Sequence, residues 1–125
     1  MAGWQVTQDR PYTRTLGAGV DGPISVTGVG GNQTGVGTIG NLLSAGIVNN
    51  GTIASTGTGA NAGSITLIGT SGNSNVGAAQ GFRQDGAVST VDGDISITGT
   101  SNTCVDGCFG SSIRANIAAT GDGNI

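Results

Sequence analysis

Three aspartates in the second half of the chain are the residues best placed to do chemistry. Asp92 and Asp94 lie two positions apart, so an extended strand would carry both carboxylates on one side, and Asp122 follows Asp92 by 30 residues. Paired carboxylates hydrolyse glycosidic bonds, and several convergent oxygens bind Ca²⁺. No basic or aromatic residue accompanies these aspartates to hold a sugar, and the Gly-Gly-x-Gly-x-Asp repeat of calcium-loaded proteins is absent. We therefore expect Asp92 and Asp122 to be turn residues before glycine, with side chains bonded to their own backbone.

The lack of histidine restricts the chemistry further. Without His there is no His-based acid-base catalysis, no Ser-His-Asp triad and no His ligand for a metal ion. We expect a protein that is not an enzyme and has no catalytic residues, no cofactor and no metal site. Cys104 and Cys108 flank a three-residue turn and are expected to form a local disulfide, which favours an oxidising compartment.

Composition and charge set the fold class and exclude some partners. The 125 residues include 26 Gly, and Ile and Val far outnumber Leu, which favours strands over helices. The sequence therefore predicts an all-β protein of one domain. A formal net charge of -3 with four Arg cannot neutralise a run of phosphates, so no nucleic acid partner is expected. The apolar runs are only a few residues long, so no membrane span is expected either.

An internal repeat organises most of the chain. Residues 24–28 (ISVTG) are echoed by residues 65–69 (ITLIG) and 95–99 (ISITG), and a further copy begins at Asn124-Ile125. The leading isoleucines of these copies are 41, 30 and 30 residues apart. We divide the chain into repeats at 22–62, 63–92 and 93–122, with a partial copy at 123–125.

A second phrase lies at a matching place in each repeat. Gly46, Gly81 and Gly110 each precede a short apolar phrase by seven residues, so every repeat holds at least two strands. The first repeat is longer than the others by eleven residues, and we expect the excess between Val29 and Ser44. Phe82 and Phe109 follow or precede the repeat glycine, and we expect both to pack at an edge.

Within each strand phrase, apolar and hydroxyl residues alternate as a period of two requires. Five Asp-Gly steps and Asn50-Gly51 are expected to supply positive-φ positions for sharp corners. The pattern predicts an inward core ladder of Ile24, Val26, Ile65, Leu67, Ile95 and Ile97. It also predicts an outward hydroxyl ladder of Ser25, Thr27, Thr66, Ser96 and Thr98.

Two architectures fit this pattern. Antiparallel hairpins would form a sandwich or barrel, whereas a parallel β-solenoid would stack equivalent strands of successive coils. The solenoid is favoured, since near-identical phrases recurring every 30 residues would lie directly over one another. We expect a solenoid of about three to four coils over residues 22–125. Residues 1–21 do not match the repeat and are expected to form an N-terminal cap or strand-exchange segment.

Residues 93–100 (GDISITGT) and 49–56 (NNGTIAST) resemble the degenerate repeats of large bacterial surface proteins, the filamentous haemagglutinin-like and autotransporter-type adhesins. The resemblance covers residues 22–125 and is one of composition and rhythm, so it transfers no catalytic or binding residue. It implies a right-handed parallel β-helix, secretion, and a role in attachment or as a rigid stalk.

The sequence therefore predicts a structural or adhesive module of a secreted or cell-surface protein. Its expected partners are other copies of itself or neighbouring repeats of a longer chain, stacked head to tail through an unpaired parallel edge, and a host-surface or polysaccharide ligand. Two alternatives remain open. One is an ice- or surface-binding solenoid, because Thr56-Gly57-Thr58 and Thr98-Gly99-Thr100 have the form of hydroxyl arrays, although Ile68 interrupts the ladder. The more distant one is a polysaccharide-active β-helix enzyme.

Overall fold

A computed structural model of the chain describes residues 14–15, 22–33 and 44–125. This part of the chain contains ten strands and one short 3-10 helix. The strands form three sheets, and every strand pairing is parallel. The predicted all-β class is confirmed, and the antiparallel hairpin alternative is wrong. The elements are β1 (Arg14–Thr15), β2 (Ile24–Val29), β3 (Ile47–Asn49), β4 (Ile53–Ser55), η1 (Gly59–Asn61), β5 (Ile65–Thr70), β6 (Ala79–Gln84), β7 (Val88–Thr90), β8 (Ile95–Thr100), β9 (Cys108–Ile113) and β10 (Ile117–Ala119).

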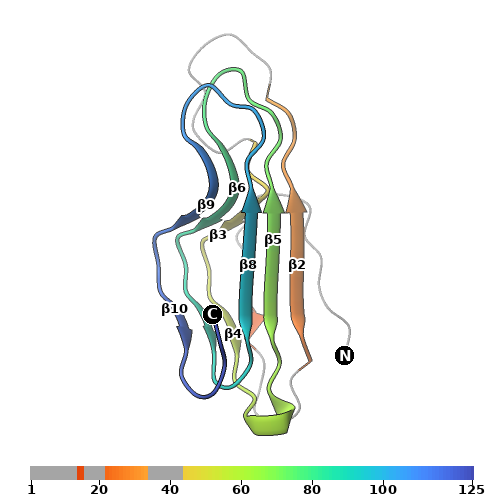
Figure 1. The fold of residues 1–125 in the computed structure, drawn as a ribbon, viewed down its shortest axis with the longest axis vertical. Helices are drawn as coiled ribbons and strands as arrows, with labels where there is room; N and C mark the ends of the chain where they lie inside the picture. The colour runs from red at the N-terminus through yellow and green to blue at the C-terminus, as the bar shows by residue number, and fades with distance from the viewer. Residues whose placement is uncertain (1–13, 16–21, 34–43) are drawn as a thin grey trace.

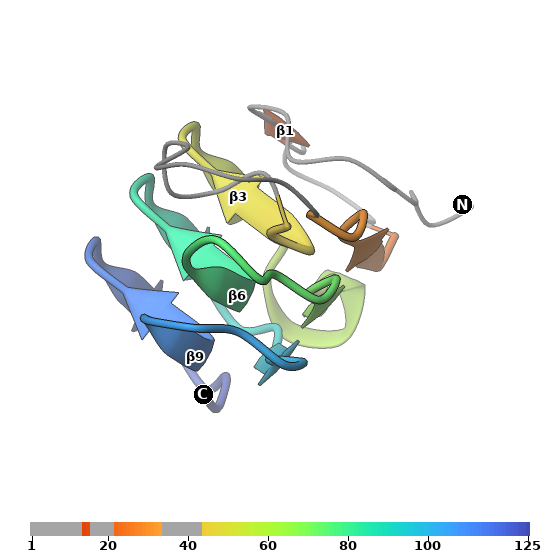
Figure 2. The same cartoon turned by 90° about the horizontal axis from the view of Figure 1, so that it is seen from above.

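Each repeat contributes one strand to each sheet. The sheet orders are β2-β5-β8, β3-β6-β9 and β1-β4-β7-β10, so the chain forms three layers of three strands, with β1 added to the first layer. Figure 1 shows β2, β5 and β8 side by side as a flat sheet, whereas β6 and β9 are curved. Seen from above, β3, β6 and β9 lie in the order of their sheet, opposite the strands of the flat sheet (Figure 2).

The repeat phrases lie over one another in register in the flat sheet. Ile24 pairs with Ile65 and Ile65 with Ile95, and the hydroxyl residues between them pair in the same way. Alternate side chains therefore point to opposite faces, and the apolar set enters the core. Ile97 is the one member of the inward ladder that is only partly buried, because no further strand covers β8 in the described structure. The buried core cluster consists of Ile24, Val26, Ile47, Ile53, Ile65, Leu67, Phe82, Val88 and Ile95.

The two phenylalanines occupy different environments, contrary to the expectation that both pack at an edge. Phe82 is fully buried and is the largest side chain of the core. Phe109 is 52% exposed, because no described strand covers the outer edge of β9, and its register partner in β6 is Gln80 and not Phe82. The similar distances from the repeat glycine conceal this difference, since Phe82 follows its glycine and Phe109 precedes it.

The extra length of the first repeat is divided between two places, so the single insertion expected before Ser44 is wrong. Ile47 follows Gln33 by 14 positions, whereas Phe82 follows Ser74, the register partner of Gln33, by eight. The first repeat is therefore longer by six residues in this part. The start of β5 follows the start of β4 by 12 positions, whereas the start of β8 follows the start of β7 by seven. The first repeat is therefore longer by five residues here. The second excess includes η1, which adds a turn at the opposite end of the flat sheet (Figure 1).

The Asp-Gly steps do not supply positive-φ corners as a class. Among the described residues, Gly59 and Gly107 are the only ones with a positive φ, and Gly107 alone belongs to an Asp-Gly step. Gly86, Gly93 and Gly123, which belong to three of the other steps, lie where the layers approach each other. At Gly86, for example, a Cβ atom would overlap the carbonyl oxygen of Gly51 in the layer before. Close stacking, and not backbone handedness, explains why glycine stands there.

Glycines also set the distance between the flat sheet and the curved sheet. A Cβ atom on Gly69 in β5 would overlap the carbonyl oxygen of Gly81 in β6. The same overlap would occur for Gly28 with Gly46 and for Gly99 with Gly110. Each layer therefore contains one facing glycine pair, and the three pairs are stacked by the strand registers.

We predict that Gly69→Ala destabilises the fold by about 2 kcal/mol or more, because the added methyl group must displace backbone and not a flexible side chain. The matched control is Gly31→Ala, where an added Cβ meets nothing within 4 Å. Its effect should stay within about 0.5 kcal/mol. Urea unfolding monitored by circular dichroism measures both, and equal midpoints for the two variants would contradict the glycine-pair explanation.

Candidate functional site

The predicted hydroxyl ladder lies on the outer face of the flat sheet. Ser25, Thr66 and Ser96 form one in-register column of half-buried or exposed side chains. In the next column Ile68, which is 39% exposed, separates Thr27 from Thr98. The outer face is therefore a mixed surface of hydroxyl and aliphatic groups, without a continuous row of threonines.

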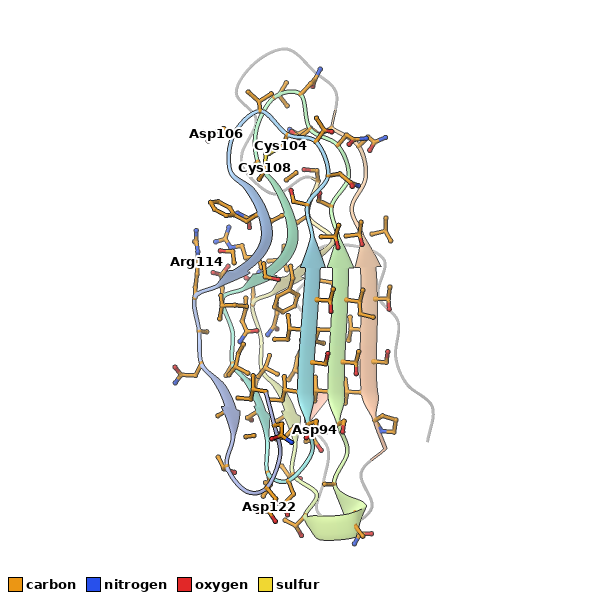
Figure 3. The ribbon with its side chains drawn as sticks, in the orientation of Figure 1. Asp94, Cys104, Asp106, Cys108, Arg114 and Asp122 are labelled. Carbon is orange, nitrogen blue, oxygen red and sulfur yellow. A yellow bond between two sulfur atoms is a disulfide. The ribbon has the colours of Figure 1, made fainter. Side chains whose placement is uncertain are left out.

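Asp92 and Asp94 bind the backbone of adjacent layers, so the expectation that the Asp92 side chain bonds to its own turn is wrong. Asp92 accepts hydrogen bonds from the N–H groups of Gly59 at 2.7 Å and Asp122 at 3.0 Å, which are 33 and 30 residues away. Asp94 accepts one from the N–H of Asn124 at 2.9 Å. These carboxylates tie three successive layers together at one end of the long axis, where Figure 3 labels Asp94 and Asp122.

The backbone donors also set the ionisation of Asp92. The N–H of Gly59 and then that of Asp122 stabilise the carboxylate and hold its pKa below the ordinary value of 3.8. A general acid for glycoside hydrolysis needs the opposite shift, because it must stay protonated near neutral pH. Within the described residues, no three His, Cys, Asp or Glu side chains are grouped to hold a metal ion.

Amide side chains make similar links between layers at the other corners, which the sequence reading missed. Asn32 accepts a hydrogen bond from the N–H of Asn73 at 2.9 Å, and Asn73 accepts one from the N–H of Thr103 at 3.2 Å. Gln84 is fully buried and donates to the carbonyl of Asn116 at 3.2 Å. The signal in the sequence was the recurrence of Asn and Gln at corner positions, which looked like ordinary loop composition.

The cysteine pair forms a disulfide that closes a loop at the other end of the molecule. Cys104 and Cys108 are bonded to each other, with their Cα atoms 5.7 Å apart. The loop contains Asp106 and Gly107, and the positive φ of Gly107 (69°) turns the chain into β9. Figure 3 shows this loop far from Asp94 and Asp122, with Arg114 between the two ends.

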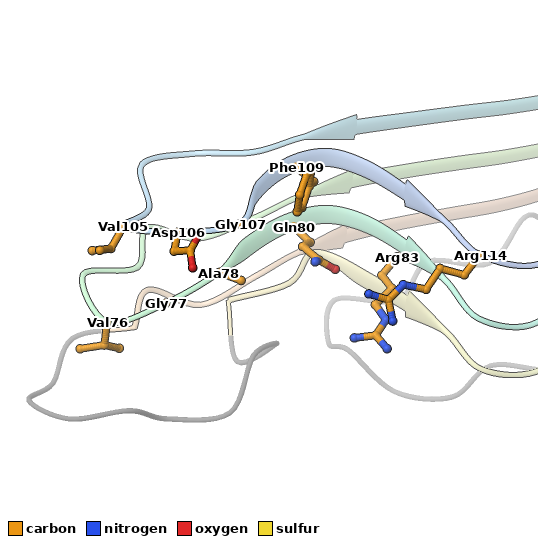
Figure 4. A pocket seen from close by; sticks show the side chains of 10 residues that line it. All are labelled: Val76, Gly77, Ala78, Gln80, Arg83, Val105, Asp106, Gly107, Phe109 and Arg114. Carbon is orange, nitrogen blue, oxygen red and sulfur yellow. The ribbon is translucent and has the colours of Figure 1, made fainter.

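A groove of about 330 Å³ runs from this loop along the outside of β6 and β9 (Figure 4). A straight strand would point Gln80 and Arg83 to opposite sides, yet both line the groove because β6 is curved. The volume is at the lower end of the range of small-molecule sites. Its lining consists of Val76, Gly77, Ala78, Gln80, Arg83, Val105, Asp106, Gly107, Phe109 and Arg114.

The groove joins an unsatisfied amide, an exposed ring and two guanidinium groups. Gln80 is only 7% exposed, and its Oε1 has no hydrogen-bond partner in the described structure. Phe109 lies beside it in the register of β6 and β9. Arg83 Nε is 2.6 Å from Asp85 Oδ2 without hydrogen-bond geometry, and Arg114 Nη1 is 3.9 Å from Asp85 Oδ1. One carboxylate thus stands between two cations.

The outer edge of the third layer is a second candidate surface. No described strand pairs with the outer edges of β8, β9 and β10. A groove of about 320 Å³ opens there, and Ile113 in it is 47% exposed. The apolar lining continues the core ladders of the layers beneath. The groove is lined by Ile95, Ser96, Ile97, Ser111, Ile113, Ile117 and Ile125.

The partial fourth copy already makes the bond that begins each layer. The N–H of Ile24 donates to Ser64 O at 2.9 Å, and the N–H of Ile65 donates to Asp94 O at 2.8 Å. The N–H of Ile95 donates in the same way to Asn124 O at 2.8 Å. Asn124 therefore occupies, above the third layer, the position that Asp94 occupies above the second.

Comparison with known proteins adds no assignment to this geometry. No protein-family model, curated protein or solved structure matches the chain.

The expected N-terminal cap lies outside the described residues except for β1, which pairs with β4 of the first layer. The described part of the chain has no helix with the length and apolar character needed to cross a bilayer. The functional assignment of this chain therefore rests on its two grooves and on the stacking of its layers.

We predict that Asp92 contributes to the pH dependence of stability. Its lowered pKa means that the carboxylate stabilises the fold above the unfolded-state pKa, and this contribution is lost as the pH falls through the folded-state pKa. Urea midpoints measured between about pH 6 and pH 2 should fall less steeply for Asp92→Asn than for the wild type. Asp106→Asn, in the disulfide loop, is the control and should follow the wild-type curve. Parallel curves for Asp92→Asn and the wild type would contradict this role.

Proposed function

We propose that this chain is a non-enzymatic structural and adhesive module of a secreted or cell-surface protein, built as a right-handed parallel β-solenoid. Support for the solenoid comes from three layers whose equivalent strands pair in parallel and in register. Support for the handedness comes from the general rule that crossovers between parallel strands are right-handed in the large majority of cases. The disulfide is compatible with an oxidising compartment.

The observation that carries the proposal is the open, in-register edge of the third layer. Its exposed isoleucines continue buried columns, and Asn124 already repeats the bond that begins each layer. Such an edge offers backbone hydrogen bonds and an apolar surface to any parallel strand with the same repeat. The module therefore works by stacking, and its ladders need neither a catalytic group nor a large core.

The occupant we propose for this edge is the first layer of a second copy of the chain. In the described part of the chain β2 and β3 are at the edges of their sheets, so each offers a parallel partner to β8 and β9. In the third sheet β1 already pairs with β4, so β1 is the strand that would meet β10. Repeated head-to-tail stacking would build a fibre, because the two surfaces differ and the contact does not close on itself. Stacking on a further repeat of a longer chain uses the same edge and is the alternative outcome.

The first test adds a layer to the edge. We predict that a chain in which residues 93–122 are duplicated after residue 122 unfolds at a higher urea concentration and in one transition, because the new layer covers Ile97 and Ile113. Urea unfolding and sedimentation velocity measure the stability and the compactness. A duplicated segment that unfolds separately, or that leaves the midpoint unchanged, would show that the edge does not accept another layer.

The second test concerns assembly between copies. We predict that the wild-type chain self-associates with increasing concentration and that Ile113→Lys abolishes this, since a cation in the apolar groove would be desolvated. Ile68→Lys is the matched control, because Ile68 is exposed to a similar extent but lies on the outer face of the flat sheet. Sedimentation velocity over a range of concentrations, with electron microscopy, measures assembly. Monodisperse wild-type protein at every concentration would rule out head-to-tail stacking of copies.

A further inference from the structure

We propose that the groove along β6 and β9 is a binding site for an acidic oligosaccharide whose anionic group is a carboxylate, such as a chain of hexuronate units. Such a ligand combines three features in a short length: a planar anion, hydroxyl donors and an apolar face of C–H groups. The groove presents a partner for each of these features on one surface (Figure 4). This inference supplies a ligand for the adhesive role proposed above and does not depend on stacking at the third layer.

The amide oxygen of Gln80, which has no hydrogen-bond partner among the described residues, is the first observation that supports a ligand in this groove. The Gln80 side chain is more than nine-tenths buried, and its Oε1 accepts no hydrogen bond from the described residues. Buried amide oxygens without a partner are uncommon in folded proteins, because their desolvation is uncompensated. Figure 4 shows the Gln80 carboxamide on the same side of the strands as the guanidinium groups of Arg83 and Arg114. A small shift of this side chain would let a ligand hydroxyl donate to Oε1.

Phe109 supplies a surface for the apolar face of a sugar ring. Half of its area is exposed, and it is the second residue of β9, directly after Cys108 of the disulfide loop. It is paired directly with Gln80, so one sugar ring could contact the phenyl face while its hydroxyl reaches the amide. The edge of an aromatic ring beside a polar side chain favours an amphipathic ligand over a purely apolar one.

The two arginines select a carboxylate. Arg83 is partly buried and held by Asp85, whereas Arg114 is more than half exposed and only 3.9 Å from the same carboxylate. The guanidinium of Arg114 therefore retains donors for a ligand anion, and its planar fork fits a carboxylate. Arg83 follows Gln80 by three positions, or about 10 Å of strand, so a ligand of two or three sugar units would reach from the amide to the cations.

The opposite end of the groove gives the site a direction. Asp106 and Val105 line it from the disulfide loop, and the bond between Cys104 and Cys108 holds this loop beside the groove. The Asp106 carboxylate repels an anion and accepts hydrogen bonds from hydroxyl groups. A chain of hexuronate units would therefore bind with one carboxylate at Arg114 and with hydroxyl groups, and not its other carboxylates, directed at Asp106.

The test is calorimetric titration of the full chain with trigalacturonate, with maltotriose as the neutral comparison. We expect saturable binding of trigalacturonate that weakens with added salt, and binding of maltotriose at least about tenfold weaker. Arg114→Gln and Phe109→Ser should each weaken trigalacturonate binding by about tenfold. Val29→Ser is the matched control for Phe109→Ser, because Val29 is exposed to a similar extent outside the groove, and it should bind as the wild type does.

Each other result overturns the proposal. If the binding of trigalacturonate does not saturate, or if Arg114→Gln and Phe109→Ser bind it as tightly as the wild type does, this groove is not its binding site. Acetate or a peptide C-terminus that competes as well as trigalacturonate shows a carboxylate site without sugar recognition. Circular dichroism of each variant confirms that it is folded. None of these outcomes changes the layer-duplication or sedimentation results, so the ligand and the stacking role fail independently.

Discussion

Two of the three sheets meet along a line of facing glycines, one pair in each layer, and the rest of the structure depends on this contact. At Gly69 and Gly81 the backbones approach so closely that a Cβ atom has no room. On one side of the line the sheets enclose Phe82 and the stacked isoleucines, which form the core. On the other side the curved sheet turns outward, and the largely buried Gln80 lines the outer groove. The core and the groove therefore follow from one close approach of backbone to backbone.

Stacking explains how a chain with so few charges and aromatics holds together. Parallel pairing satisfies backbone groups between layers, and side chains such as Asp92, Asn73 and Gln84 satisfy the backbone at the corners where strands end. Each of these polar groups bonds to a residue about one repeat away, so every layer stabilises the next. This arrangement needs small residues and short polar side chains, and these are the residues that dominate the composition.

The two grooves have different physical characters, which suits them to different partners. The third-layer groove is lined mainly by isoleucine and is bordered by unpaired strand edges, so it favours a strand that continues the ladders. The groove along β6 and β9 contains charged and amide groups with one exposed ring, so it favours a polar ligand. Both grooves include residues of β9, with Ile113 in the first and Phe109 in the second.

The sequence by itself determined the strand class, the repeat and the register of the flat sheet. The alternation of apolar and hydroxyl residues and the 30-residue spacing place Ile65 and Ile95 at the same position of successive layers. The sequence also marked both sets of repeat glycines, but it could not show that they face each other, since that contact joins different sheets. The division of the first repeat's extra length, the exposure of Phe109 and the interlayer role of Asp92 were decided only by the tertiary structure. Each depends on which residue lies one layer away, and the local pattern of a single strand or turn carries no information about that neighbour.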